Sequence, residues 1–157
     1  MLTTIERRSL QMDYEEYEKQ CKIIQKENEK YLDLFEQELE QQGLSTKTIN
    51  RHLGNVDFYI NEYMLYEEPR SMDEGVYMID MFLGYFFIRK CMWSTPASIK
   101  STAASIKKFY KCMLDHGKIE KDDYDSLCSE IKERMPDWQS DCAQFNDPDA
   151  PNPFAFF

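Results

Sequence analysis

The chain has 157 residues, of which 42% are hydrophobic and 14% aromatic, so it is long and apolar enough to bury a core. Five glycines and six prolines are too few for a turn-rich β fold, and no run of 18 apolar residues predicts a membrane span. The formal net charge of −10 argues against a uniformly basic nucleic-acid-binding protein.

The first predicted element is a long helix. Residues 1–30 are expected to form an N-terminal arm and a helical extension, with a loose arm over residues 1–11 and a helical period from Met12 to Gln42. The repeat forms a heptad-like seam of Tyr14, Tyr17, Cys21, Ile24, Asn28, Tyr31 and Phe35. Such a seam indicates either a partner helix, including a homodimer contact, or a helix packed on its own bundle. The second interpretation is favoured because the seam is short and mostly aromatic.

A second helix is expected from residue 46 to about residue 64. Ser45 is a suitable N-cap for it, because a serine hydroxyl accepts a hydrogen bond from the first turn. Lys47 and Arg51 lie four residues apart near its start and point away from its apolar face. This helix therefore offers two cations to whatever lies outside the fold.

A third helix is expected from residue 72 to about residue 91. Ser71 and Glu74 have the spacing of a capping box in front of an apolar run. The run is apolar around much of its circumference, so this helix is predicted to be the most buried. The candidate core of the chain consists of Leu53, Ile60, Ile79, Phe82, Phe86, Ile106 and Tyr110.

The fourth helix is the most informative element. Hydroxyl residues and a proline at positions 94–96 favour a helix start, and Gly117 favours its end. Its predicted buried stripe is Ile99, Ala103, Ile106, Tyr110 and Met113. Lys100, Lys107 and Lys111 form a second stripe, about 100° around the helix. Residues 89–121 carry eight bases and two acids, whereas the sequence on both sides is acidic.

A fifth helix is expected over residues 121–135, where a proline then stops the pattern. Residues 136–157 are rich in proline and end in aromatic residues, so they are expected to form an extended tail. This tail is expected to dock on its own domain, a neighbouring copy or another protein. Asp147 and Asp149 flank a proline, which favours a turn over a cation site. Residues 31–135 are therefore expected to form one helical domain.

The sequence carries no motif for catalysis, cofactor binding or a metal site. It has no glycine-rich phosphate loop, no G-x-S-x-G, no H-E-x-x-H and no calcium loop. His52 and His116 belong to no visible triad, and the five cysteines are odd in number and lack C-x-x-C spacing. We therefore expect no catalytic residue, no metal ligand, no cofactor and no membrane partner, and free thiols in a reducing cytoplasm.

Several short motifs in the central region resemble one protein family. They are Leu34-Phe35-Glu-Gln-Glu-Leu39, Gly43-Leu44-Ser45-x-x-Thr48, Phe58-Tyr59-Ile60-x-x-Tyr63, Ser98-Ile99-Lys100, Ile106-Lys107-Lys108-Phe109-Tyr110-Lys111 and His116-Gly117-Lys118-Ile119. From about Tyr31 to Ile119 this arrangement resembles the N-terminal core-binding (SAM-like) domain of tyrosine recombinases, or phage integrases. We expect an all-α fold: a compact orthogonal bundle of four to five helices with a long N-terminal helix and an extended C-terminal tail.

The resemblance also implies a function. In such recombinases this domain forms one jaw of a clamp around DNA, while a separate domain cuts the strand. The candidate DNA-binding residues are Lys47, Arg51, Lys100, Lys107, Lys108 and Lys111. Too few residues follow Ile119 to form a catalytic domain, and residues 120–124 replace the usual linker with acidic sequence.

The chain is therefore predicted to be a non-catalytic, integrase-like DNA-binding domain that acts in DNA recombination or integration. Its expected partners are DNA and a recombinase or a second copy of itself. The alternative is a helical protein–protein interaction module that uses the heptad-like seam and the C-terminal tail.

Overall fold

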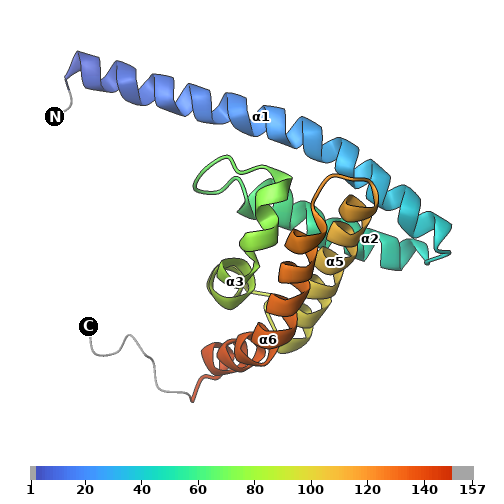
Figure 1. The fold of residues 1–157 in the computed structure, drawn as a ribbon. Helices are drawn as coiled ribbons and strands as arrows, with labels where there is room; N and C mark the ends of the chain where they lie inside the picture. The colour runs from blue at the N-terminus through green and yellow to red at the C-terminus, as the bar shows by residue number, and fades with distance from the viewer. Residues whose placement is uncertain (1–2, 150–157) are drawn as a thin grey trace. The chain divides into compact units, whose positions relative to one another are not determined.

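The structure, a computed structural model, describes residues 3–149, without the side chains of residues 6–12, and contains no strand within them. The chain divides into two compact units, Met1–Gly75 and Val76–Phe157. The first unit contains α1 (Thr4–Gln41), α2 (Thr46–Asp57) and the π-helical segment η1 (Phe58–Tyr63), and the 3-10 segment η2 (Met72–Tyr77) follows. The second unit contains α3 (Ile79–Met81), the π-helical segment η3 (Phe82–Phe86), α4 (Phe87–Lys90), α5 (Pro96–Asp115) and α6 (Lys121–Asn146) (Figure 1). The predicted all-α fold class is confirmed.

The long N-terminal helix is confirmed, because α1 is a single helix of 38 residues. The expectation of a loose arm over residues 1–11 is wrong, since α1 already begins at Thr4 and crosses residue 30 without a break. The helix ends before Gly43, whose φ of 74° lies in the left-handed region that glycine adopts without a Cβ penalty.

Part of the heptad-like seam packs inside the first unit, where α1 contacts α2 and η1. Asn28 is 1% exposed and donates a hydrogen bond of 3.2 Å to the backbone carbonyl of Ile60. The Tyr17 hydroxyl donates to the backbone carbonyl of Leu65. Tyr14, by contrast, is exposed. The seam therefore contacts its own unit at Tyr17 and at Asn28, which supports the favoured interpretation.

Two predicted caps form. The Ser45 hydroxyl accepts a 3.2 Å hydrogen bond from the backbone N–H of Thr48 and so starts α2. The Glu74 carboxylate accepts a 3.0 Å hydrogen bond from the backbone N–H of Ser71. The second cap starts a 3-10 turn instead of an α-helix.

The predicted third helix over residues 72–91 is interrupted. Its first part is the 3-10 segment η2, and Met78, with φ −107° and ψ 2°, separates it from the helix α3–η3–α4. One cause is a buried hydrogen bond of 2.6 Å from the Tyr59 hydroxyl to the Gly75 carbonyl. In a continuous α-helix this carbonyl would accept from the N–H four residues later, so the tyrosine competes with the helix.

Five of the seven candidate core residues are fully buried, namely Ile60, Ile79, Phe82, Ile106 and Tyr110. Leu53 and Phe86 are only half-buried. The buried face of α2 follows Ile49, His52 and Val56, so Leu53 lies at its edge. The predicted buried faces of the helices are therefore correct, except that they include two residues at the edge of the core.

The predicted limits of α5 are confirmed. Thr95 is its N-cap and forms a reciprocal capping box with Ser98, with hydrogen bonds of 3.0 and 2.7 Å, and Pro96 occupies the first helical position. Gly117, with φ 70°, follows its last turn. The whole predicted apolar stripe of this helix is buried.

The predicted stop at Pro136 is wrong, because α6 continues through it to Asn146. A proline inside a helix costs about 3 kcal/mol, since it removes a hydrogen bond and crowds the preceding turn. Beyond it, α6 buries Trp138 and Cys142 to 1% exposure or less. Burying one large apolar side chain contributes about 1.5–3 kcal/mol, so burial of Trp138 offsets much of the cost and the smaller Cys142 adds to it.

The extended tail predicted for residues 136–157 therefore does not include residues 136–146. Asp147 and Asp149 form a turn, in which the Asp147 carboxylate accepts a 2.9 Å hydrogen bond from the N–H of Asp149. The remainder of the predicted tail, residues 150–157, lies outside the described residues.

One polar contact joins α6 to the helix α3–η3–α4. The Trp138 indole N–H donates a 2.7 Å hydrogen bond to the Asp80 carboxylate, and Arg134 lies 3.2 Å from the same carboxylate. Gly84 lies directly beside the indole, because a Cβ at this position would be 2.9 Å from the Trp138 ring. Burial alone would raise the pKa of Asp80, but the bonds from Trp138 and Arg134 outweigh it and hold that pKa below its usual range.

The contact at Gly84 can be tested by substitution. Gly84→Ala should lower the free energy of unfolding by about 1–3 kcal/mol, because the added methyl group overlaps a buried ring. Gly54→Ala is the matched control, since a Cβ at Gly54 in α2 meets nothing within 4 Å. It should raise the free energy by about 0.5–1 kcal/mol through helix propensity. Chemical denaturation measures both values, and equal effects of the two variants would contradict this packing of Gly84 on Trp138.

Acid should weaken the same contact. The folded-state pKa of Asp80 is below the value of about 3.9 in the unfolded chain, so ionised Asp80 contributes stability above that pH. This contribution is lost as the pH falls through the folded-state pKa. The difference in unfolding free energy between wild type and Asp80→Asn should therefore shrink in acid. Urea titrations at pH values from about 6 to about 2.5 measure it, and a difference independent of pH would refute the assignment.

Candidate nucleic-acid interface

The outer face of α5 carries the predicted row of lysines. Lys100, Lys107 and Lys111 are all exposed, and Lys108 is exposed beside them. The buried residues of the helix lie on its other side. Because each residue advances an α-helix by 1.5 Å, the row is about 16 Å long.

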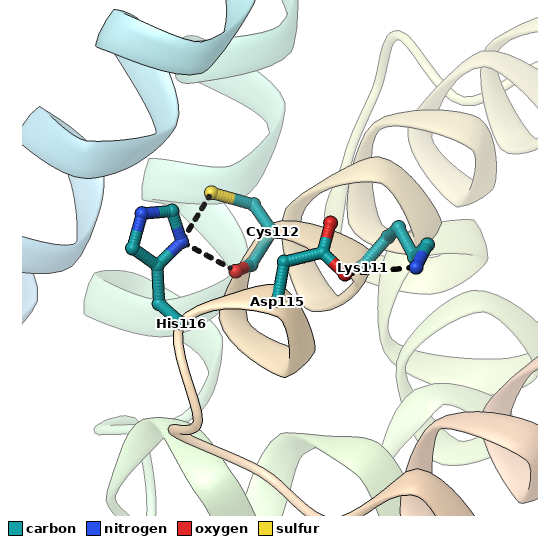
Figure 2. Close-up of polar contacts among 4 residues, drawn as sticks. All are labelled: Lys111, Cys112, Asp115 and His116. Carbon is teal, nitrogen blue, oxygen red and sulfur yellow. Dashed lines mark hydrogen bonds and ion pairs between the residues drawn. The ribbon is translucent and has the colours of Figure 1, made fainter.

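The lysines in this row differ in whether an acidic side chain lies beside them. Figure 2 shows the Lys111 ammonium group 2.8 Å from the Asp115 carboxylate, one helical turn further along. Within the described residues, Lys100 and Lys107 have no acidic partner. These two lysines therefore keep their full charge for an external anion.

A groove of about 470 Å³ runs between α5 and α6, which pack side by side (Figure 1). Lys100 and Lys107 line it from α5, and Lys132 lines it from α6. Its apolar lining consists of Ala103, Ala104, Ile131 and Met135, with Cys128 among the remaining residues. The groove thus brings together three cations from two helices.

Lys132 was not among the predicted site residues. It lies four residues after Cys128 and one after Ile131, so the apolar pattern of the predicted fifth helix already placed it beside the packed face. The predicted stop at Pro136 left only a short helix, so its packing along α5 was not predicted. In the structure the contact between the two helices extends past Pro136 to Gln139, whose side chain donates a 3.0 Å hydrogen bond to the Pro96 carbonyl.

Another face of α6 is acidic. A depression of about 730 Å³ on this face is lined mainly by Asp122, Asp125, Glu130 and Glu133, with Arg134 at one side. Burial and the nearby Asp80 raise the pKa of Glu130. These carboxylates would repel a polyanion on this face of α6.

Lys47 and Arg51 belong to α2 in the first unit, whereas the other four predicted residues belong to α5 in the second. Both are exposed and lie one turn apart, as the sequence indicates. They neighbour His52, which is 5% exposed and faces Phe35 of α1 with ring centroids 6.5 Å apart. They form a second, smaller basic patch on their own unit.

A cysteine and a histidine lie together at the end of α5. The Cys112 sulfur is 3.7 Å from His116 Nδ1, and the same nitrogen is 2.9 Å from the Cys112 carbonyl (Figure 2). A carbonyl only accepts, so we assign the proton to Nδ1, and this nitrogen then has no lone pair to accept the thiol proton. Because Cys112 is also fully buried, the pair fastens the helix end and is not arranged as a nucleophile and its base.

Metal sites and membrane spans are absent from the part of the chain that the structure describes. No group of three histidine, cysteine, aspartate or glutamate side chains there is placed to hold a metal ion. No helix there has both the length and the apolarity of a membrane span. All five cysteines are free, and burial raises the pKa of the Cys91 thiol to about 11.

The three groove lysines should contribute little to folding. Changing Lys100, Lys107 and Lys132 together to glutamate should shift Tm by less than about 3 °C, because isolated exposed charges contribute little stability. Thermal denaturation followed by circular dichroism measures this. A fall of more than about 10 °C would show instead that the lysines hold the two helices together.

Comparison of the chain with protein-family models, curated proteins and solved structures found no match in any of the three. The resemblance to integrase core-binding domains therefore stays a prediction from sequence motifs. The arrangement of lysines on α5 and α6 is the observation on which a functional proposal can be built.

Proposed function

We propose that this chain is a non-catalytic DNA-binding domain that contacts the DNA backbone through the lysine face of α5. The observation that carries the proposal is the convergence of Lys100, Lys107 and Lys132 on one groove. Phosphates are bound by such exposed point charges, and each neutralised phosphate releases a counterion. Lys108 and Lys111 extend the same face.

The chemistry of this face favours contacts that position DNA without reading its sequence. Lysine is a flexible point charge, whereas base recognition usually needs planar, bidentate groups such as arginine or asparagine. The second candidate site, Lys47 and Arg51 on α2, adds one more point charge and only one planar, bidentate group. We therefore expect affinity for duplexes in general, with little preference among sequences.

The role we propose in DNA recombination or integration follows from the integrase-like motifs. In that role the chain binds DNA, and a recombinase partner or another copy of the chain completes the complex. Strand cleavage would come from a recombinase, because the chain itself is proposed to be non-catalytic. The five free thiols suit a reducing cytoplasm, the compartment we propose for the chain.

A second candidate function is a helical protein-interaction module. The apolar lining of the groove favours it, because Ile131 and Met135 offer surface that a phosphate backbone does not use. The heptad-like seam supports it less, since Asn28 and Tyr17 are already bonded inside the first unit. Salt dependence separates the two functions, because an apolar interface responds weakly to salt.

The DNA-binding proposal predicts a specific loss. Changing Lys100, Lys107 and Lys132 to glutamate should strongly weaken binding of a mixed-sequence duplex at low salt, and should reduce the log–log salt slope by about 2.7 if three phosphate contacts are lost. Fluorescence anisotropy over a salt series measures both. Asp115→Asn should tighten binding, because it frees Lys111 from its 2.8 Å ion pair.

The matched control changes Lys19, Lys26 and Lys30 of α1 to glutamate. These three lysines are also exposed, so the net charge changes equally while the groove stays intact. The control should bind nearly as well as wild type. Equal losses in both triple variants would show that only net charge matters, and failure of wild type to bind any duplex at about 50 mM salt would refute the proposal.

A further inference from the structure

The groove between α5 and α6 combines two properties, and phosphate binding alone explains only the second of them. Its lining is largely apolar, with Ala103, Ile131 and Met135 among the residues that form it. Its cations have no acidic partner within residues 3–149. A surface that is apolar inside and cationic at its edges fits a peptide segment that carries both aromatic side chains and carboxylates.

One segment of this chain has that composition. Residues 147–157 read Asp-Pro-Asp-Ala-Pro-Asn-Pro-Phe-Ala-Phe-Phe, with two carboxylates followed by three phenylalanines. We infer that this segment occupies the α5–α6 groove of its own molecule. The inference does not rest on DNA binding, because groove occupancy is measured without DNA.

The start of the segment is well placed. Asn146, the last residue of α6, donates a 2.7 Å hydrogen bond from its side chain to the Ser94 carbonyl, just before α5 begins. The segment therefore leaves α6 beside the N-terminal end of α5. Lys100 lies one helical turn into α5 from that end.

The length of the segment matches the position of the groove. From Asn146 back to Ile131, α6 rises about 22 Å, at 1.5 Å for each residue. Because residues 147–149 form a turn, the reach comes from the residues after it, and eight extended residues, 150–157, span up to about 26 Å. In this inference Phe154 reaches the level of Met135 and Phe157 that of Ile131, and both of these α6 residues line the groove.

The attachment at Asn146 fixes the direction of the segment, and the charges agree with it. Asp147 and Asp149 come first and remain near the beginning of the groove, on the side of Lys100, while the phenylalanines lie further along its apolar lining. Burial of phenylalanine is favourable, whereas burial of an unpaired carboxylate is costly.

The half-buried thiol of Cys128 reports on the groove, because it is part of the lining. In the full chain, N-ethylmaleimide should label Cys128 slowly. Changing Phe154, Phe156 and Phe157 to serine should speed its labelling about tenfold, as expected for an effective concentration of about 1 mM and a peptide Kd of about 0.1 mM. Peptide mapping by mass spectrometry gives the rate for each cysteine.

Two controls test whether the protection is specific to the groove and to the segment. Cys21 of α1 is also half-buried but lies in the first unit, so its labelling rate should not change. A synthetic peptide of residues 147–157, added to the triple-serine variant, should restore protection of Cys128 in a saturable manner. The same peptide with its phenylalanines replaced by serine should not.

Three results would overturn the inference. The first is equal labelling of Cys128 in wild type and the triple-serine variant. The second is failure of the peptide to protect the variant. The third is protection in wild type that disappears on dilution, which would show that the segment comes from another copy. Protection that is independent of protein concentration supports binding within one molecule.

Discussion

The second unit depends on the hydrogen bond between the Trp138 indole and the Asp80 carboxylate. The carboxylate loses water on folding, and the indole N–H and the Arg134 guanidinium replace part of that solvation. Gly84 permits the contact, because a larger residue would occupy the space of the ring. The same helix α6 forms one wall of the groove and is joined to the start of α5 by the hydrogen bonds from Gln139 and Asn146 to the Pro96 and Ser94 carbonyls.

The charges of α6 are separated by face. Its acidic residues surround one depression, while Lys132 faces the groove together with Lys100 and Lys107. A chain with a net charge of −10 can still present a local positive field, because potentials near a surface follow the nearest charges. The α5 side of the groove is therefore the less repulsive side for a polyanion. If both proposals hold, the C-terminal segment and DNA compete for the same lysines.

Local signals predicted the fold where local interactions decide it. The hydroxyl, proline and glycine residues around α5 specified its two ends, because caps depend only on near neighbours. Pro136 misled the prediction, because the helix is continued by burial of Trp138, which depends on contacts distant in sequence. The break at Met78 was missed for a similar reason, since the Tyr59 hydroxyl that takes the Gly75 carbonyl lies 16 residues away. Lys132 was not predicted as a site residue, because its place in the groove depends on the packing of α6 along α5.

The π-helical segment η1 has a consequence for how the chain tolerates changes in length. In η1 the N–H of Met64 bonds to the Tyr59 carbonyl, five residues earlier, and both side chains are buried. An α-helix joins residues four apart, so η1 holds one residue more than an ordinary turn. Deleting the exposed Glu62 would place Met64 four residues after Tyr59, on the same helical face. The fold could thus lose a residue here without moving its buried row, which makes this turn a natural position for a deletion.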